Sequence, residues 1–167
     1  MRSSEGRWEG SVMRKGIVVA AIAAAFVAGV VAVAVANQAR IAAPMTIAVV
    51  EHATTDKVVD VGRTGDSTGD LLTFHNVLFD ATNTDRVGTD QGVCVRISPV
   101  HGTWECRWIA WLDGQGALTV EGSFSDHHAT TFAITGGTGI FANARGTMRL
   151  EFRDDPAEFD FTYRVIP

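Results

Sequence analysis

The sequence contains few of the residues and motifs that mark metal or nucleic-acid binding. It has two cysteines and five histidines among 167 residues. None of them has the CxxC or HExxH spacing of a metal site, so we expect no bound metal. The 14 lysines and arginines are scattered along a chain whose net charge is −5. A chain without a basic stripe lacks the usual footprint of a nucleic-acid-binding protein, and we expect no such partner.

The chain also lacks helical periodicity from Met45 onward. Segments rich in Val, Ile, Thr, Phe and Trp alternate there with turns that contain Gly, Asp, Asn, Ser or Pro, a pattern typical of short strands. Many short strands with tight connections predict a closed barrel or a sandwich. We expect strands at Met45–Glu51, Lys57–Val61, Leu71–Ala81, Gln91–Ile97, Thr103–Trp111, Ala117–Phe124, Thr130–Thr135, Thr147–Phe152 and Glu158–Ile166.

One long hydrophobic run stands apart from the strands. Residues 16–36, GIVVAAIAAAFVAGVVAVAVA, carry no charge and follow a basic segment at 1–15. The run has the features of a signal peptide, but it is also long enough to be an uncleaved membrane anchor. In either case the positive-inside rule places the rest outside the cytoplasm, secreted or anchored. We expect a linker at 37–44 and a β-barrel domain at 45–167, with membrane contact only through an uncleaved 16–36.

The glycine-rich stretch TFAITGGTGIFANARG, residues 131–146, invites comparison with a phosphate-binding loop. Such a loop follows a parallel strand, opens a helix and in one class ends in GK[ST]. None of these features is present here. We therefore expect the glycines to allow positive φ angles and close backbone approach at a corner between strands.

Cys94 and Cys106 flank a turn centred near Val100. Residues directly opposed across such a hairpin share a face, and outside the cytoplasm two cysteines so placed would oxidise. We predict a disulfide between them. The alternative is a free Cys94 that lines a pocket.

Four segments resemble plant allene oxide cyclase: GDLLTFHNVLFD (69–80), RVGTDQGVCVRI (86–97), GALTVEGSF (116–124) and the glycine-rich stretch. The last also resembles the dirigent proteins. The resemblance implies an all-β, eight-stranded antiparallel barrel with an apolar cavity, usually a homotrimer, and no cofactor. In both families, confinement of a reactive substrate in one shape selects the product.

The same resemblance implies which residues form the site. Glu51 would assist charge development in the substrate, and Asn76 would help to hold a water. Ala53 stands where the family has a second asparagine. The expected ligand-contacting residues are Leu72, Phe74, Cys94, Trp104 and Phe124.

We therefore expect an exported barrel that binds a hydrophobic small molecule, of lipid or phenolic origin, and directs its cyclisation or isomerisation. Two alternatives stay open: a non-catalytic carrier, and a structural cell-surface barrel whose core is filled by Phe74, Trp104 and Phe124. A register slip of one residue would turn Glu51 to the solvent, because neighbouring strand residues face opposite sides.

Overall fold

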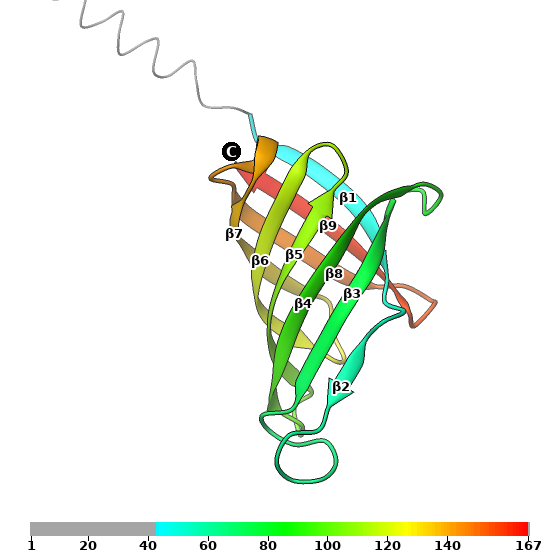
Figure 1. The fold of residues 1–167 in the computed structure, drawn as a ribbon, viewed down its shortest axis with the longest axis vertical. Helices are drawn as coiled ribbons and strands as arrows, with labels where there is room; N and C mark the ends of the chain where they lie inside the picture. Colours follow the sequence, from blue (N-terminus) through cyan, green and yellow to red (C-terminus); the bar gives the residue numbers. More distant parts are fainter. Residues whose placement is uncertain (1–42, 167) are drawn as a thin grey trace, which may run out of the picture. The chain divides into compact units, whose positions relative to one another are not determined.

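The computed structural model describes residues 43–166 of the chain, which contain nine strands and one 3₁₀-helix joined by loops (Figure 1). The predicted segments 1–15 and 16–36, and the linker up to residue 42, lie outside the described residues. Within 43–166 no helix is both long and apolar enough to cross a bilayer. The elements are β1 (Met45–His52), β2 (Lys57–Val59), β3 (Leu71–Asp80), β4 (Arg86–Ser98), β5 (Thr103–Leu112), β6 (Gly116–Ser125), β7 (Thr130–Gly137), η1 (Gly139–Phe141), β8 (Arg145–Phe152) and β9 (Glu158–Ile166).

Eight of the strands close into a barrel. From β3 to β9 each strand pairs antiparallel with its neighbour in sequence, and β1 pairs with both β9 and β3. The β1–β3 pairing joins the two edges of the sheet, so no long edge is left to pair with another chain. The short β2 pairs only with β3 and lies outside the closed ring. The predicted eight-stranded antiparallel barrel is confirmed.

Strand β4 begins five residues before the predicted start, at Arg86 rather than Gln91. The intervening residues, RVGTD, have turn-like composition, but in the barrel they pair with both neighbouring strands. Cross-strand hydrogen bonding therefore overrides weak local propensity. The longer strand places Asp90 on the same inward face as Cys94, because side chains two residues apart point to one side.

The predicted disulfide is confirmed. Cys94 and Cys106 are directly opposed in the β4–β5 ladder, with their Cα atoms 4.0 Å apart, and their sulfurs are bonded. Both side chains are buried on the inner wall. The alternative of a free Cys94 is therefore wrong, although the disulfide does line the lumen.

The glycine-rich stretch forms a corner, as predicted. Gly139 has a φ of +63°, and a Cβ at Gly137 would come within 2.6 Å of the Ala117 carbonyl oxygen. Both positions therefore need glycine. The chain does not stay extended after the corner. It forms the short η1 helix, which buries Phe141.

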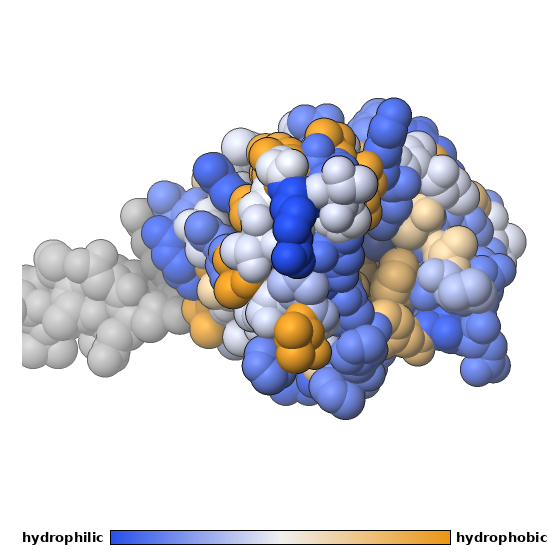
Figure 2. Space-filling view, turned by 90° about the horizontal axis from the view of Figure 1, so that it is seen from below, coloured by the Kyte–Doolittle hydropathy of each residue, from blue (hydrophilic) through white to orange (hydrophobic). Residues whose placement is uncertain are grey.

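The interior is filled at one end and hollow at the other. Side chains near the η1 end are fully buried and pack into a continuous core, whereas those where β3 begins and β6 ends are only partly covered. We call this second end the mouth; it is the lower end in Figure 1 and faces the viewer in Figure 2. The filled core comprises Leu78, Leu112, Leu118, Val120, Phe132, Phe141, Met148 and Val165, among others.

Arg96, near the end of β4, fastens two loops at the mouth. Its buried guanidinium donates to both carboxylate oxygens of Asp66, at 2.8 and 3.0 Å, and to Asp126. It also lies 4.0 Å from the centre of the Trp104 ring. Asp66 belongs to the loop between β2 and β3, and Asp126 to the loop between β6 and β7. One side chain therefore holds both loops against the barrel.

Replacement of Arg96 by methionine is expected to lower the free energy of unfolding by about 2 kcal/mol. Removal of one partner of a buried ion pair costs about 3–5 kcal/mol, and the solvent exposure of Asp66 and Asp126 reduces that cost. Urea unfolding would measure it. The control is Arg86→Met, whose pair with Asp113 is exposed and should change stability by less than about 0.5 kcal/mol. Equal effects of the two variants would contradict the role of Arg96.

Candidate functional site

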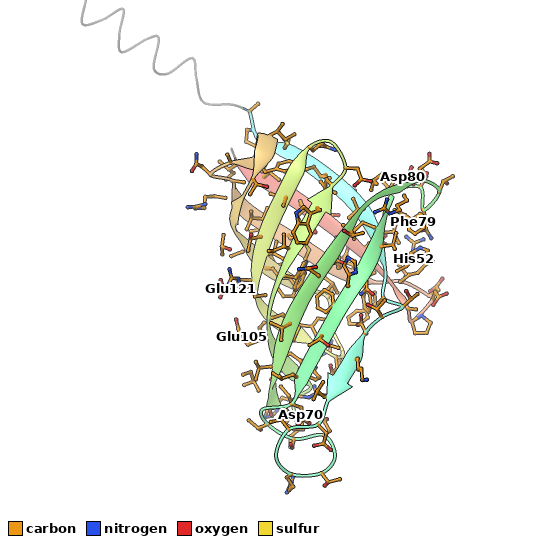
Figure 3. All side chains as sticks on the ribbon, in the orientation of Figure 1. His52, Asp70, Phe79, Asp80, Glu105 and Glu121 are labelled. Atoms are coloured by element: carbon orange, nitrogen blue, oxygen red, sulfur yellow. A yellow bond between two sulfur atoms is a disulfide. The ribbon has the colours of Figure 1, made fainter. Side chains whose placement is uncertain are left out.

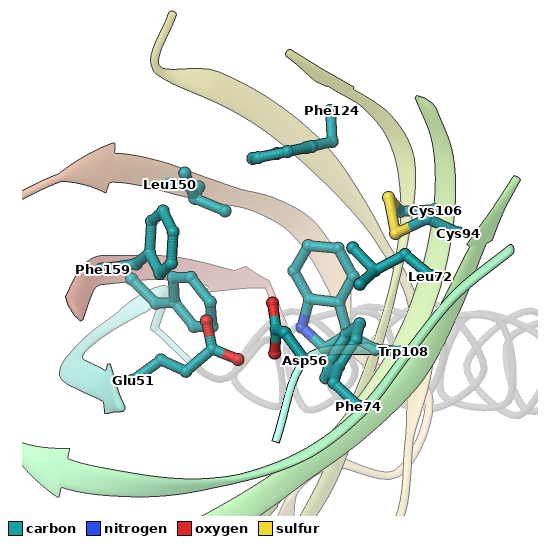
Figure 4. A pocket seen from close by; sticks show the side chains of 11 residues that line it. Glu51, Asp56, Leu72, Phe74, Cys94, Cys106, Trp108, Phe124, Leu150 and Phe159 are labelled. Carbon is teal, nitrogen blue, oxygen red and sulfur yellow. A yellow bond between two sulfur atoms is a disulfide. The ribbon is translucent and has the colours of Figure 1, made fainter. Parts of the chain in front are cut away.

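A cavity of about 60 Å³ lies inside the mouth of the barrel (Figure 4). Its walls are mainly aromatic and aliphatic, with two carboxyl groups directed into it. Apolar walls with a few polar groups are typical of small-molecule sites. The lining residues are Glu51, Asp56, Leu72, Phe74, Cys94, Cys106, Trp108, Phe124, Leu150, Phe159 and Phe161.

Glu51 is the buried carboxyl of this cavity. It lies near the end of β1 on the inward face, with 6% of its surface exposed. Its Oε1 accepts a hydrogen bond of 2.8 Å from Asn76 Nδ2, and its carboxyl lies beside that of Asp90. Burial, and then the nearby carboxyls of Asp90 and Asp56, raise the pKa of Glu51 well above its ordinary value. The group can therefore hold a proton at pH values where an exposed glutamate cannot.

Asn76, on β3, holds this carboxyl in place. Its amide nitrogen donates to Glu51 and, at 2.7 Å, to Asp56 Oδ1. Its amide oxygen accepts from the Thr55 backbone N–H at 3.1 Å and hydroxyl at 2.8 Å. A primary amide offers two donors and two acceptor positions, and all four are used. The Asn76 amide therefore has no donor or acceptor position left for a water. The water-holding role that the resemblance implies stays a prediction, and this geometry does not favour it.

Asp56 lies at the rim of the cavity, between β1 and β2. Its position there depends on the hydrogen bond from Asn76. Partial desolvation by the surrounding side chains raises the pKa of Asp56, and the hydrogen bond from Asn76 opposes that rise. Sequence reasoning missed this residue because it belongs to a loop, where no strand alternation indicates the direction of a side chain.

Trp108 forms the inner wall of the cavity. Its ring packs against Phe132 with centroids 4.5 Å apart, and lies close to Phe161 at 5.9 Å and Phe74 at 6.1 Å. Gly92 lies opposite Trp108 in the β4–β5 ladder, and a Cβ there would stand 2.8 Å from the Phe74 ring. Only glycine leaves room for both rings on this wall.

The expected ligand-contacting residues come together with one exception. Leu72, Phe74, Cys94 and Phe124 line the cavity with Glu51. Trp104 does not, because it points toward the mouth loops, where its indole nitrogen donates to Asp126 at 2.8 Å. Trp104 belongs to the core cluster against which Phe74 and Phe124 pack, but these side chains leave the cavity open.

Asp90 was missed by the sequence analysis. It lies opposite Asn76 in the β3–β4 ladder and is fully buried. Burial raises its pKa to about 7. The alternation that places Cys94 inward extends to Asp90 and would have found it, had the strand been expected to begin early enough.

Within residues 43–166 no three His, Cys, Asp or Glu side chains are arranged to hold a metal ion. The polar groups of the cavity are instead the two carboxyls held by Asn76. Such a pair is suited to hydrogen bonding and proton transfer.

The chain has relatives among known families and structures. The family model for allene oxide cyclase matches residues 37–165. A pyocyanin demethylase is 26% identical, with a TM-score of 0.62 over 72% of this chain and 99% of that one. A pterocarpan synthase dirigent protein is 19% identical, with a TM-score of 0.64 over 74% and 87%. An exo-specific intermolecular Diels–Alderase is 13% identical, with a TM-score of 0.59 over 74% and 98%.

The last two likenesses show the shared fold alone. The family match covers most of the chain and includes every strand of the barrel. The chain therefore belongs to the allene oxide cyclase family.

Proposed function

We propose that this barrel binds an apolar small molecule in its cavity and directs the cyclisation or isomerisation of that molecule, with Glu51 as the acid–base group. The observation that carries the proposal is the buried Glu51 carboxyl, which lines an apolar cavity and is held by Asn76 through one of its oxygens. A carboxyl whose pKa is raised by burial can hold a proton at pH values where an exposed glutamate cannot, and can give that proton to a substrate.

The mechanism needs no group beyond the chain and the substrate. The walls hold the substrate in one folded shape, so that proximity and orientation select the product. Protonated Glu51 donates its proton to a substrate oxygen as negative charge develops there. The carboxylate then takes a proton back as the product forms. No atom is gained or lost overall, as isomerisation requires.

One relative supports this class of reaction by its name. A Diels–Alderase, a ring-forming enzyme, shares the barrel, whereas the pyocyanin demethylase is named for the removal of a methyl group. The cavity of about 60 Å³ is smaller than the roughly 300–1,000 Å³ of typical ligand sites. We infer that one ring or a short chain enters it, and that the rest of the ligand lies at the mouth beside Phe124 and Phe159.

Replacement of Glu51 by glutamine is expected to reduce turnover at least about 100-fold, because general acid–base catalysis contributes about 10²–10⁴-fold. Ligand affinity should stay within about threefold, since glutamine keeps the shape of the side chain and can still bond to Asn76. Native mass spectrometry of the protein from its own host would first identify the bound molecule. Turnover and affinity would then be measured with that molecule.

The matched control is Glu121→Gln, on the outer face of β6 (Figure 3), which should change neither quantity. Unchanged product formation in the Glu51 variant would refute the catalytic role. If the bound molecule is recovered unaltered from both proteins, the barrel is a carrier, which needs the cavity but not the acid–base group.

We further propose that the chain is exported and that it assembles as a homotrimer. The disulfide supports export, because such bonds persist in oxidising compartments. The exposed apolar residues Val93, Val95 and Ile97 on the outer face of β4 support assembly, which would cover them. Light scattering would give the mass of the assembly, and intact mass would show whether residues 16–36 remain.

A further inference from the structure

Four of the five buried polar side-chain atoms without a hydrogen-bond partner in residues 43–166 belong to three residues. They are both carboxyl oxygens of Asp90, the indole nitrogen of Trp108 and the hydroxyl of Tyr163. Each of these residues is at most 4% exposed. Buried polar groups in folded proteins are nearly always hydrogen-bonded, so a bound polar group would gain well-placed partners at such a cluster.

The three residues lie in one part of the lumen. Asp90 is opposite Ala110 on β5, and Trp108 is two residues away on the same inward face. Tyr163 comes from β9, where Phe161 packs against both Tyr163 and Trp108. The indole N–H lies beside the Tyr163 hydroxyl without reaching hydrogen-bond geometry. Burial, and then the charges of Asp90 and Glu51, raise the pKa of Tyr163 well above its ordinary value.

This cluster adjoins the cavity through Trp108, which belongs to both. Beyond the apolar walls of the cavity, a ligand that reached past the indole edge would meet polar groups rather than more hydrocarbon. The Glu51 carboxyl also lies beside that of Asp90, whose charge contributes to the raised pKa of Glu51.

We propose that Asp90, Trp108 and Tyr163 form a polar subsite at the inner end of the cavity, which receives a hydroxyl group at the leading end of the ligand. A hydroxyl matches the cluster because it is both donor and acceptor. It can donate to the Asp90 carboxylate and accept from the Trp108 indole N–H or the Tyr163 hydroxyl. A hydrocarbon end would leave all these groups unpartnered.

The proposal rests on the proposed function, since it needs the cavity to admit a ligand, and it narrows the ligand to a hydroxylated apolar molecule. It also orients that ligand: the hydroxyl lies innermost, and the remainder passes Glu51 toward the mouth. A matched pair of small probes can separate the two claims. 4-Methylphenol and p-xylene have nearly the same shape and differ by a hydroxyl in place of a methyl group.

Titration calorimetry of the full chain would measure the affinity of each probe. We expect the protein to bind 4-methylphenol about tenfold more tightly than p-xylene, the effect of about one well-placed buried hydrogen bond. Tyr163→Phe removes only the hydroxyl oxygen and should reduce this preference to about threefold or less, with p-xylene affinity unchanged. Asp90→Asn should also reduce the preference for 4-methylphenol, and it provides the test if Tyr163→Phe does not fold.

Phe124→Leu is the control at the mouth. It should weaken the binding of both probes equally and leave the ratio of their affinities unchanged, because Phe124 lines the apolar part of the cavity. Equal binding of the two probes to the unaltered protein would overturn the subsite and leave the apolar cavity as the binding site, with the polar cluster bonded to resident water. An unaltered ratio in both subsite variants would overturn it as well. Binding of neither probe would overturn the subsite together with the proposed function.

Discussion

Replacement of Asp90 by asparagine is expected to raise the free energy of unfolding at pH 8 by up to about 4 kcal/mol. Asp90 is fully buried and neither of its carboxyl oxygens has a hydrogen-bond partner in the described part of the chain. A buried charge without a partner is destabilising. The pKa of Asp90 is about 7 in the fold, against an ordinary value of 3.8. A difference of this size corresponds to about 4 kcal/mol of lost stability when the group is ionised.

The direction follows from proton binding. Because burial raises the pKa of Asp90 in the fold, the folded state binds more protons than the unfolded state between about pH 4 and 7. Stability must therefore fall as pH rises through this interval, and then level off. Glu51 acts in the same direction, since its pKa is also raised. Asp70 and Asp80 act in the opposite direction, because hydrogen bonds lower their pKa values in the fold. They stabilise the fold when ionised, and that stabilisation is lost only as the pH falls below the ordinary pKa of an aspartate.

Urea unfolding of both proteins at intervals from pH 4 to 8.5 would check this. The unaltered protein should lose stability toward pH 8, and Asp90→Asn should lose much less. At pH 4 the two should differ little, because the carboxyl is then neutral in the fold. Parallel pH profiles would contradict the assignment of a raised pKa to Asp90.

Loss of the disulfide is expected to lower the free energy of unfolding by about 3 kcal/mol. The bond joins residues 12 apart in sequence and restricts the unfolded chain. A loop of about this length corresponds to about 3 kcal/mol in the chain-entropy description. The ladder between β4 and β5 pairs ten residues on each strand and persists without the bond, so the barrel should still fold.

The double variant Cys94→Ser, Cys106→Ser and the reduced unaltered protein should show the same fall in urea midpoint. Agreement between them would assign the effect to the bond rather than to the new side chains. An unchanged midpoint in both would show that the hairpin is already constrained in the unfolded chain.

The barrel could be predicted because its signal is local and repeated. Alternation and turn residues locate each strand within a few positions, and four motifs indicate the family. The predicted hairpin with its turn near Val100 placed Cys94 opposite Cys106, as the β4–β5 pairing shows. Strand ends were less predictable: RVGTD at the start of β4 has the composition of a turn and pairs only because two neighbouring strands are there to pair with.

The sequence by itself thus determined the strand pattern and the disulfide, whereas the direction of Glu51 depended on a register that the β1 pairings decide. Only the tertiary structure decided which groups Glu51 meets. Asn76, Asp56 and Asp90 come from two strands and a loop, and they surround one carboxyl because the sheet closes between β1 and β3. The physical reason is that a side chain's direction follows from local backbone geometry, whereas burial, hydrogen-bond partners and pKa depend on elements that approach from distant parts of the chain.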